Sequence, residues 1–353
     1  MINPWRATCI QMPSKIARNA PSRNEAWEII EQNLNSAKLL IEKAMEADPQ
    51  PSLLVLPEFG FQGPPRGESV DQWIDKACYT VPGPITEPLQ DLARQFGVFI
   101  GGNQFEFDPA WKNRYFNTSF IIDADGEVIL RYRRIHTAQW VSPHDFLDQY
   151  LDRYGYDGLW PVVDTKLGRM ATLACGEIMI PEAARTLMLR GAEILVHPTN
   201  EPISEAEEAA KVVAAAANMM YVVSTNVAGP IGFSDGEPLN AEEGGPEPIL
   251  GGSSRIVDYE GNTVALETSP SATVDVSSLL DIEALRSARS ENSMSNSLLR
   301  IRYETFAKTY EGTSVYPANF FLDTPMSHWK DTAKAAERSL RNLEKLGVNS
   351  PEK

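Results

Sequence analysis

Short apolar runs alternate with longer amphipathic segments along most of this chain, and this alternation restricts its fold more than any other sequence feature. Leu53-Leu54-Val55-Leu56 is apolar at every position and ends at Pro57, which is typical of a strand buried on both faces. The preceding segment, residues 24–47, carries apolar residues at helical spacing. Strands that alternate with helices in this way predict an α/β fold.

The same pattern continues beyond residue 250. Further strands are predicted at residues 7–11, 98–101, 159–164, 170–175, 194–197, 221–226 and 253–258, and helices at residues 87–96, 181–190 and 205–219. A hairpin is expected from residues 117–122 to 127–133, because Asp123-Ala-Asp-Gly126 is a strong turn signal. Hairpins beside helix-crossed strands predict mixed sheets, and two sheets between two helical layers fit this order best.

The pattern predicts one large domain and an appendage. Residues 1–280 contain no obvious linker and form the predicted domain. From Leu279 onward the chain becomes polar and helical, and it ends in a stretch rich in Ala, Glu, Lys and Arg. Such a stretch has too few apolar residues to form its own core. Residues 281–353 are therefore expected to be a C-terminal extension that packs at an oligomer interface, in a homodimer or a larger assembly.

Charge and composition narrow the possible partners. The formal charge of −16, spread along all 353 residues, argues against binding to nucleic acid or to an anionic membrane and favours a small-molecule substrate. The N-terminus lacks a secretory pattern and no stretch approaches a membrane span, so a cytoplasmic protein is expected. The three cysteines and four histidines show neither disulfide nor metal-ligand spacing. No cofactor or metal is expected.

Three segments carry residues suited to catalysis, and the first places Glu58 directly after the buried strand at residues 53–56. A carboxylate that emerges from apolar surroundings has its charged form disfavoured, so its pKa rises toward the range of a general base. Considered alone, Glu58 is about as well explained as an ordinary surface acid that follows a strand.

The second segment is Arg131-Tyr-Arg-Arg-Ile-His136, at the end of the hairpin. Strand alternation puts Tyr132, Arg134 and His136 on one face. A buried arginine needs an anionic partner or a substrate oxyanion. In isolation, a solvated basic strand end is the better interpretation of this segment.

The third segment is Met170-Ala-Thr-Leu-Ala-Cys-Gly-Glu177, in which a strand ends at Cys175 and a helix follows. Gly176 permits a tight turn, and backbone N–H groups after the cysteine can face an oxyanion. A lone cysteine is usually a buried core residue. Because small and polar residues follow Cys175, we favour a nucleophile at the edge of the core.

Together and in this order, these segments resemble the nitrilase, or carbon–nitrogen hydrolase, superfamily. The resemblance spans roughly residues 5–270, and each piece is weak alone while the ordered set is specific. Its pieces are Ala7-Thr-Cys-Ile-Gln11, Leu-Pro-Glu58, Tyr115-Phe-Asn-Thr118, Asp125-Gly-Glu-Val-Ile-Leu-Arg-Tyr-Arg-Arg134, Leu167-Gly-Arg-Met-Ala-Thr-Leu-Ala-Cys175, Pro181-Glu182, Val222-Val-Ser-Thr-Asn226 and Gly251-Gly-Ser-Ser254.

The resemblance implies a four-layer αββα sandwich and a Glu–Lys–Cys triad. Glu58 corresponds to the family's base and Cys175 to its nucleophile, but Arg134 stands where the family has its lysine. Arginine stays charged, so it can hold an oxyanion without supplying a proton. The nearest lysines in sequence, Lys112 and Lys166, do not end the matching strand and are not expected to substitute for it.

The family commonly has a second carboxylate between its lysine and its cysteine. Asp145, Asp148 and Asp152 lie in that interval, and Asp152 is our choice for a fourth catalytic residue. The substrate pocket is expected to include five residues: Tyr115, Gly176, His197, Thr199 and Asn200.

These residues predict a hydrolase of a non-peptide carbon–nitrogen bond, in an amide or an N-carbamoyl group, that acts through a thioester on Cys175. A nitrile is the less favoured substrate, because a nitrile develops negative charge on nitrogen and Arg134 is a poor proton donor. Glu177 instead favours a nitrile substrate, because nitrilases proper tend to carry a glutamate at this position. A third alternative is a catalytically silent binding or regulatory protein with the same fold.

Overall fold

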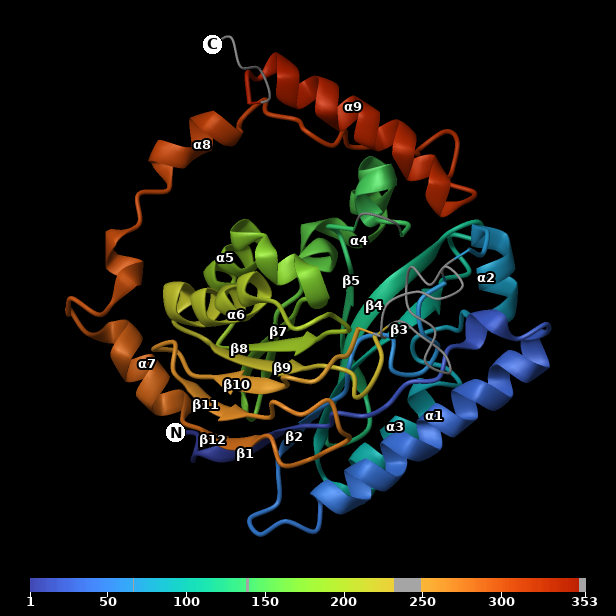
Figure 1. The fold of residues 1–353 in the computed structure, drawn as a ribbon. Helices are drawn as coiled ribbons and strands as arrows, with labels where there is room; N and C mark the ends of the chain where they lie inside the picture. Colours follow the sequence, from blue (N-terminus) through green and yellow to red (C-terminus); the bar gives the residue numbers. More distant parts are fainter. Residues whose placement is uncertain (66, 138–139, 232–248, 349–353) are drawn as a thin grey trace.

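The computed structural model describes residues 1–65, 67–137, 140–231 and 249–348, and within these ranges the strands form two six-stranded sheets (Figure 1). In spatial order, the first sheet consists of β12 (Ser277–Leu280), β1 (Trp5–Cys9), β2 (Leu53–Val55), β3 (Phe99–Phe107), β4 (Tyr115–Ile122) and β5 (Val128–Arg133). The second consists of β11 (Thr263–Leu266), β10 (Arg255–Val257), β9 (Tyr221–Thr225), β8 (Ile194–Pro198), β7 (Gly168–Thr172) and β6 (Val163–Thr165).

Both sheets mix parallel and antiparallel neighbours. In the first sheet β1, β2 and β3 are parallel, and β12, β4 and β5 add antiparallel pairs. In the second sheet β7, β8 and β9 are parallel, with antiparallel strands on both sides. Parallel neighbours need helical crossovers and antiparallel neighbours need only turns, which is the pattern that the sequence shows.

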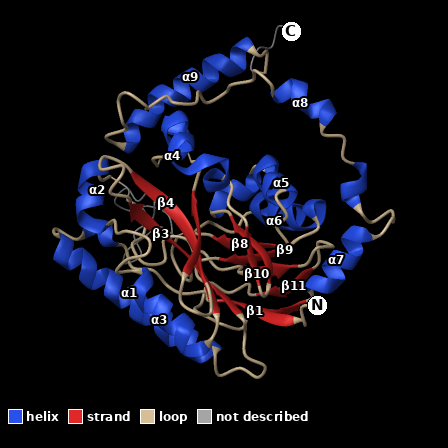
Figure 2. Ribbon diagram, turned by 180° about the vertical axis from the view of Figure 1, so that it is seen from behind, coloured by secondary structure: helices blue, strands red, loops and turns tan. Residues whose placement is uncertain are grey.

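Helices cover the outer faces of the two sheets, as Figures 1 and 2 show from opposite sides. The first sheet is covered by α1 (Arg23–Ala44), α2 (Val70–Ala77) and α3 (Thr86–Phe96), and the second by α5 (Pro181–Leu189) and α6 (Glu205–Asn218). The predicted αββα architecture is therefore confirmed. In the described ranges, no helix combines the length and the apolar character needed to cross a membrane.

The two sheets approach each other closely because the residues between them are small or branched. Ala7, Leu53 and Val55 of the first sheet belong to the same buried cluster as strand residues of the second. At Gly101 in β3, an added Cβ would lie 2.6 Å from Cγ1 of Val196 in β8, so any larger residue there would push the sheets apart.

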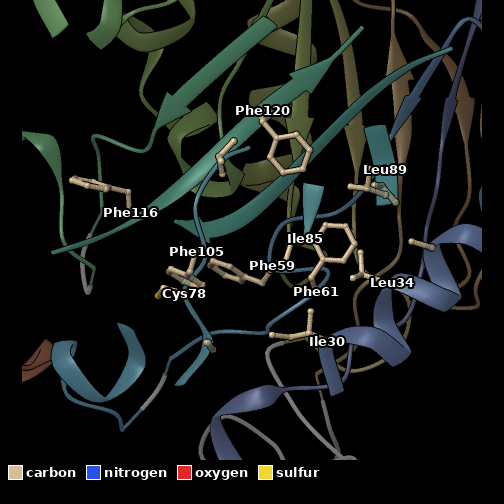
Figure 3. Packing of buried hydrophobic residues seen from close by; sticks show 14 of the residues in the cluster. Ile30, Leu34, Phe59, Phe61, Cys78, Ile85, Leu89, Phe105, Phe116 and Phe120 are labelled. Atoms are coloured by element: carbon tan, nitrogen blue, oxygen red, sulfur yellow. The ribbon is translucent and has the colours of Figure 1, made fainter. Parts of the chain in front are cut away.

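A second buried cluster joins the first sheet to its helical layer (Figure 3). Ile30 and Leu34 from α1 and Leu89 from α3 belong to it. Phe59 stacks on Phe105 of β3 with ring centroids 5.1 Å apart. Because Phe59 directly follows Glu58, this packing fixes the loop that carries the candidate base.

Within the described residues, sequence periodicity misplaced one strand and missed four α-helices or strands. Residues 159–164 were predicted as a strand, but α4 (Leu147–Leu159) continues to Leu159 and the strand, β6, covers only residues 163–165. The apolar residues Leu159 and Trp160 belong to the end of a helix that packs on the sheets, so the prediction was wrong there. Helices α2 and α4 and strands β11 and β12 were not predicted.

The C-terminal extension forms an arc around the domain, with α7 (Ile282–Ser290), α8 (Glu304–Tyr310) and α9 (Thr332–Lys345) along it (Figure 1). Part of it is held by the domain of its own chain. The N–H of Asn319 donates to the carbonyl of His144 at 3.0 Å, and Arg114 donates to the carbonyl of Phe321 at 3.0 Å. Its predicted place at a subunit interface, and the homo-oligomer itself, stay predictions.

Candidate active site

Glu58 is fully buried at the C-terminal end of β2 and is held by amide side chains of neighbouring strands. Nδ2 of Asn117 donates to Oε1 of Glu58 at 2.7 Å, and Nδ2 of Asn103 donates to Oδ1 of Asn117 at 2.6 Å. Oδ1 of Asn103 accepts from the N–H of Phe59 at 3.2 Å. The carboxylate is therefore oriented by a chain of hydrogen bonds that returns to its own loop.

Arg134 follows β5 and forms an ion pair with Glu58. Nη1 of Arg134 donates to Oε1 of Glu58 at 2.9 Å, and Nε donates to the carbonyl of His136 at 3.0 Å. Burial raises the pKa of Glu58, although Arg134 and Asn117 act in the opposite direction. Burial also opposes the charge on Arg134, but Glu58, together with Cys175, Glu177 and Tyr132, outweighs it and raises the pKa of Arg134. The guanidinium is therefore a fixed positive charge.

Cys175 lies just beyond the end of β7 and is the first residue of a short 3-10 helix, η3 (Cys175–Met179). Its φ is 48°, in the left-handed region that costs energy for a residue with a side chain. We expected Gly176 to supply the conformational freedom of this turn, but the unusual backbone angle lies on the cysteine itself. Gly176 instead leaves space beside Arg134, because a Cβ added there would lie 3.6 Å from Nη2 of Arg134.

The Cys175 thiol lies between two carboxylates. Its Sγ is 3.6 Å from Oε2 of Glu201 and 4.0 Å from the carbonyl oxygen of Asn200. Burial, followed by the charges of Glu58 and Glu201, raises the pKa of this thiol well above its ordinary value. The resting nucleophile is therefore a neutral thiol.

Glu201 and Lys211 are the two charged residues of this site that our sequence interpretation missed. Nζ of Lys211, on α6, lies 2.7 Å from Oε1 of Glu201 and 2.7 Å from Oε1 of Glu208. Glu201 and Lys211 are both almost completely buried. Burial opposes the charge on Glu201, but the charges of Lys211 and His197 and the hydrogen bonds from Lys211 and Thr199 together outweigh it and lower the pKa of Glu201. A lysine is thus present near the nucleophile, although it does not occupy the position of Arg134.

Asn226 fixes the loop that carries Glu201. Its Oδ1 accepts from the N–H of Glu201 at 3.1 Å, and its Nδ2 donates to the carbonyl of Glu201 at 2.9 Å. Asn226 itself lies just after β9, within one of the segments that resembled the family. The only sequence signal for Glu201 was its place after a strand and next to Thr199 and Asn200.

His197, Thr199 and Asn200 support the nucleophile and the base rather than forming an open wall. Nε2 of the fully buried His197 lies 2.9 Å from the carbonyl oxygen of Cys175, and Nδ1 lies 2.9 Å from Oγ of Ser224. The carbonyl of Thr199 accepts from the N–H of Glu58 at 3.2 Å, and Nδ2 of Asn200 donates to the carbonyl of Glu58 at 3.3 Å. These contacts join the ends of β2, β7 and β8.

Two predicted residues lie elsewhere. Asp152 lies on the exposed face of α4, whereas Leu147, Tyr150 and Tyr154 form the inward face of that helix. The structure therefore does not bring Asp152 to Cys175. Tyr115 is buried and packs edge to face against Phe105, with ring centroids 5.4 Å apart. It belongs to the aromatic packing behind Glu58.

Glu177 is turned away from any substrate. Its Oε1 accepts from the hydroxyl of Tyr132 at 2.7 Å and from the N–H groups of Ile135 and His136 at 3.0 and 2.8 Å. The residue after Gly176 is therefore tied to the strand end that carries Arg134. This role explains a buried glutamate here without reference to nitrile chemistry.

A cavity of about 630 Å³ opens beside Arg134 and Gly176. In the described part of the chain, no group of three or more His, Cys, Asp and Glu side chains is arranged to hold a metal ion. The arrangement at Cys175 thus offers a nucleophile, two carboxylates and a fixed cation next to a space for a ligand.

Comparison with known proteins identifies the family. Residues 6–284 match the family described as carbon-nitrogen hydrolase. This chain belongs to the carbon–nitrogen hydrolase family. Membership confirms the resemblance and the enzyme class predicted from the sequence.

Individual relatives are more distant. The chain is 27% identical to the omega-amidase NIT3 of Saccharomyces cerevisiae over 47% of this chain and 57% of the relative, so it spans only about half of that protein. It is 28% identical to a formamidase of Bacillus cereus, over 68% of each chain. The crystal structure of yeast Nit3 superposes with a TM-score of 0.58 and 22% identity, covering 82% of this chain and 96% of Nit3.

Two further solved structures share the fold. A carbon–nitrogen hydrolase from Helicobacter pylori has a TM-score of 0.62 and 22% identity, covering 87% of this chain and 98% of its own. An amidase from Nesterenkonia sp., in a mutant form, carries the acetamide moiety of fluoroacetamide on its active-site cysteine. It superposes with a TM-score of 0.59 at 16% identity, covering 86% of this chain and 97% of its own.

The buried His197 predicts a pH dependence of stability. Burial lowers its pKa to about 4 from 6.5. An unfolded chain binds a proton at this histidine below pH 6.5, whereas the folded chain does so only near pH 4. The contribution of neutral His197 to the free energy of unfolding is therefore complete above pH 6.5. This contribution falls by up to about 3 kcal/mol as the pH drops toward 4.

Urea unfolding at intervals between pH 7.5 and 4.5 measures this loss, and a His197→Gln variant provides the comparison. The variant should be less stable than the parent at pH 7.5 but should lose less stability on acidification. Equal losses in both proteins would show that other groups cause the acid sensitivity.

Proposed function

We propose that this chain hydrolyses the carbon–nitrogen bond of a small amide or N-carbamoyl compound through a thioester on Cys175. The observation that supports this proposal best is the meeting of Cys175, Glu58 and Arg134 at strand ends of both sheets. The names of the relatives, an omega-amidase and a formamidase, favour the same bond. A silent binding protein would have no need for a buried carboxylate, a buried cation and a strained cysteine in one place.

In the proposed first half-reaction, Glu58 takes the proton of the Cys175 thiol while Sγ attacks the carbonyl carbon. The raised pKa of Glu58, which burial causes, makes it a better proton acceptor than an exposed carboxylate. Arg134 and the N–H of Gly176 stabilise the oxyanion. Glu58 then gives the proton to the nitrogen as the carbon–nitrogen bond breaks, which leaves a thioester and a free amine or ammonia.

In the second half-reaction, Glu58 takes a proton from water as the water oxygen attacks the thioester carbon. The carbon–sulfur bond breaks, the carboxylic acid leaves, and Glu58 returns its proton to the sulfur. In this sequence Arg134 supplies charge and no proton, which suits an amide better than a nitrile because the nitrogen of an attacked nitrile must be protonated.

We assign Glu201, rather than Asp152, as the second carboxylate at the nucleophile. Its Oε2 lies 3.6 Å from Sγ of Cys175, whereas Asp152 is exposed on α4. Lys211 keeps Glu201 charged, so Glu201 accepts a hydrogen bond from the resting thiol and then from the departing nitrogen. Lys211 contacts Glu201, and Glu201 contacts the sulfur of Cys175. A lysine therefore lies close to the proposed nucleophile, although arginine stands at position 134.

A substrate screen tests the proposal. Release of ammonia or amine should be detected with simple amides or N-carbamoyl compounds, and Cys175→Ser should reduce it to background because a hydroxyl is a much weaker nucleophile here. Circular dichroism should show the variant folded, since Cys175 is at the edge of the core. Full activity in the serine variant would remove the thioester from the mechanism.

The role of Arg134 has its own test. Arg134→Ala should lower kcat/KM by roughly two to three orders of magnitude, the usual effect of losing an oxyanion donor. Arg134→Lys should retain more activity than Arg134→Ala, since a charge opposite Glu58 and one donor remain. Steady-state kinetics on the same amide measure both. An alanine variant as active as the parent would contradict the assignment.

The assignment of Glu201 predicts opposite effects on alkylation and on turnover. In Glu201→Gln, one negative charge beside the sulfur is lost, so the thiol pKa falls and iodoacetamide should label Cys175 at least about threefold faster at pH 8. Turnover should fall, because the hydrogen-bond acceptor is weakened. Mass mapping separates Cys175 from Cys9 and Cys78, which are buried.

Glu208→Gln is the matched control, since Glu208 also lies 2.7 Å from Lys211 but contacts Ser253 and Arg255 rather than Cys175. Its labelling rate should stay close to that of the parent. Slower labelling in Glu201→Gln, or the same acceleration in Glu208→Gln, would show that Glu201 has no specific effect on the thiol.

A further inference from the structure

The cavity beside the oxyanion donors has a wall built by the C-terminal extension. Arg134 and Gly176 line it, and the remaining lining comes from the loop after β5, from η2 (Pro143–Phe146), from Ile180 and from the extension. These lining residues are Ile135, His136, Thr137, Trp140, Ser142, His144, Asp145, Ile180, Val315, Tyr316 and Thr332.

The extension is anchored where it borders this cavity. The hydroxyl of Tyr316 donates to Oδ1 of Asp145 at 3.0 Å, and the ring of Tyr316 lies edge to face with His144 at 5.6 Å. Nδ2 of Asn342, in α9, donates to the carbonyl of Val315 at 2.9 Å. Residues 315 and 316 are therefore a fixed part of the wall, held from both the domain and α9.

The acidic group on this wall is used internally. Asp145 is buried, and its Oδ2 accepts from the N–H of Ser142 at 2.9 Å while its Oδ1 accepts from Tyr316. Burial raises the pKa of Asp145 to about 6 and lowers that of His144, so burial disfavours the charged form of both groups. What the wall offers a ligand is mainly aromatic and branched aliphatic surface, from Trp140 and Tyr316 among others.

We propose that this cavity binds the acyl part of the substrate, that this acyl group is an uncharged arylalkyl or branched apolar group, and that Tyr316 determines this specificity. The inference rests on the proposed function, since it takes Arg134 and Gly176, which line the cavity, as the oxyanion donors. Formamide has only a hydrogen on its acyl carbon and would leave about 630 Å³ of space without contacts. A larger apolar acyl group gains binding energy there by leaving water.

The test compares kcat/KM for formamide, isobutyramide, phenylacetamide and 3-phenylpropionamide. The arylalkyl amides should exceed formamide by about tenfold or more, since single groups in an apolar pocket are worth that much discrimination. Tyr316→Ala should lower kcat/KM for phenylacetamide by about tenfold and change that for formamide little. Formamide as the preferred substrate would overturn the proposal.

Two variants control for a purely structural effect. Tyr316→Phe keeps the ring and loses the hydrogen bond to Asp145, so it should keep the preference for arylalkyl amides. Tyr310→Ala removes an exposed tyrosine of the same extension and should leave both substrates unaffected. Equal losses on formamide and phenylacetamide in Tyr316→Ala would show that Tyr316 supports the fold and does not select the substrate.

An aldehyde titration separates failure of this inference from failure of the proposed function. The Cys175 thiol adds to an aldehyde by forming a carbon–sulfur bond while its proton moves to the aldehyde oxygen, so no amide turnover is needed. Phenylacetaldehyde should bind more tightly than acetaldehyde to the parent, and this advantage should be lost in Tyr316→Ala. If the protein shows this aldehyde preference but cleaves no amide, the proposed function is rejected and the apolar binding cavity is retained. If the two aldehydes bind equally, the proposed apolar binding cavity is rejected.

Discussion

The buried ion pair between Glu58 and Arg134 is the interaction on which the site depends. A carboxylate that is fully removed from water and has no cationic partner would be neutralised or would destabilise the fold by several kcal/mol. Arg134 makes a charged Glu58 possible and at the same time brings the end of β5 to the end of β2. Glu177 then ties that same strand end to the helix that begins at Cys175. Glu58, Arg134 and Cys175 are thus connected. Glu58 binds Arg134, and Glu177, two residues after Cys175, binds the strand end that carries Arg134.

Two of the five non-glycine residues with positive φ in the described chain lie at the same place. Phe59, directly after Glu58, and Cys175 itself both have positive φ. Such conformations persist only where the surrounding structure holds them. Phe59 is held by its stack on Phe105, and the carbonyl of Cys175 by the buried His197. The stack of Phe59 on Phe105 and the contact of His197 with Cys175 therefore help to fix the positions of Glu58 and Cys175.

Much of the fold and three residues of the candidate site could be read from the sequence, because they depend on local patterns. Glu58, Arg134 and Cys175 each follow a strand that alternation or apolar runs identify. The Glu201–Lys211 pair could not be read in this way. Lys211 lies in a helix that begins with several glutamates, where a lysine is most simply a surface charge, and only the packing of α6 on the second sheet buries it. Asp152 shows the reverse error, since its place in the expected interval says nothing about which face of α4 it occupies.

Cys175 lies between two ion pairs, Arg134 with Glu58 and Lys211 with Glu201. Each carboxylate has its own cation, but the two pKa shifts are opposite: burial prevails at Glu58, whereas at Glu201 the charges of Lys211 and His197 and the hydrogen bonds together outweigh burial. Carboxylates whose environments separate their pKa values can take different roles in one reaction. Glu58 is suited to gaining and losing the proton, whereas Glu201 is suited to staying charged. Because Arg134 keeps its charge, in the proposed mechanism proton transfer falls to Glu58, the carboxylate whose affinity for a proton is raised.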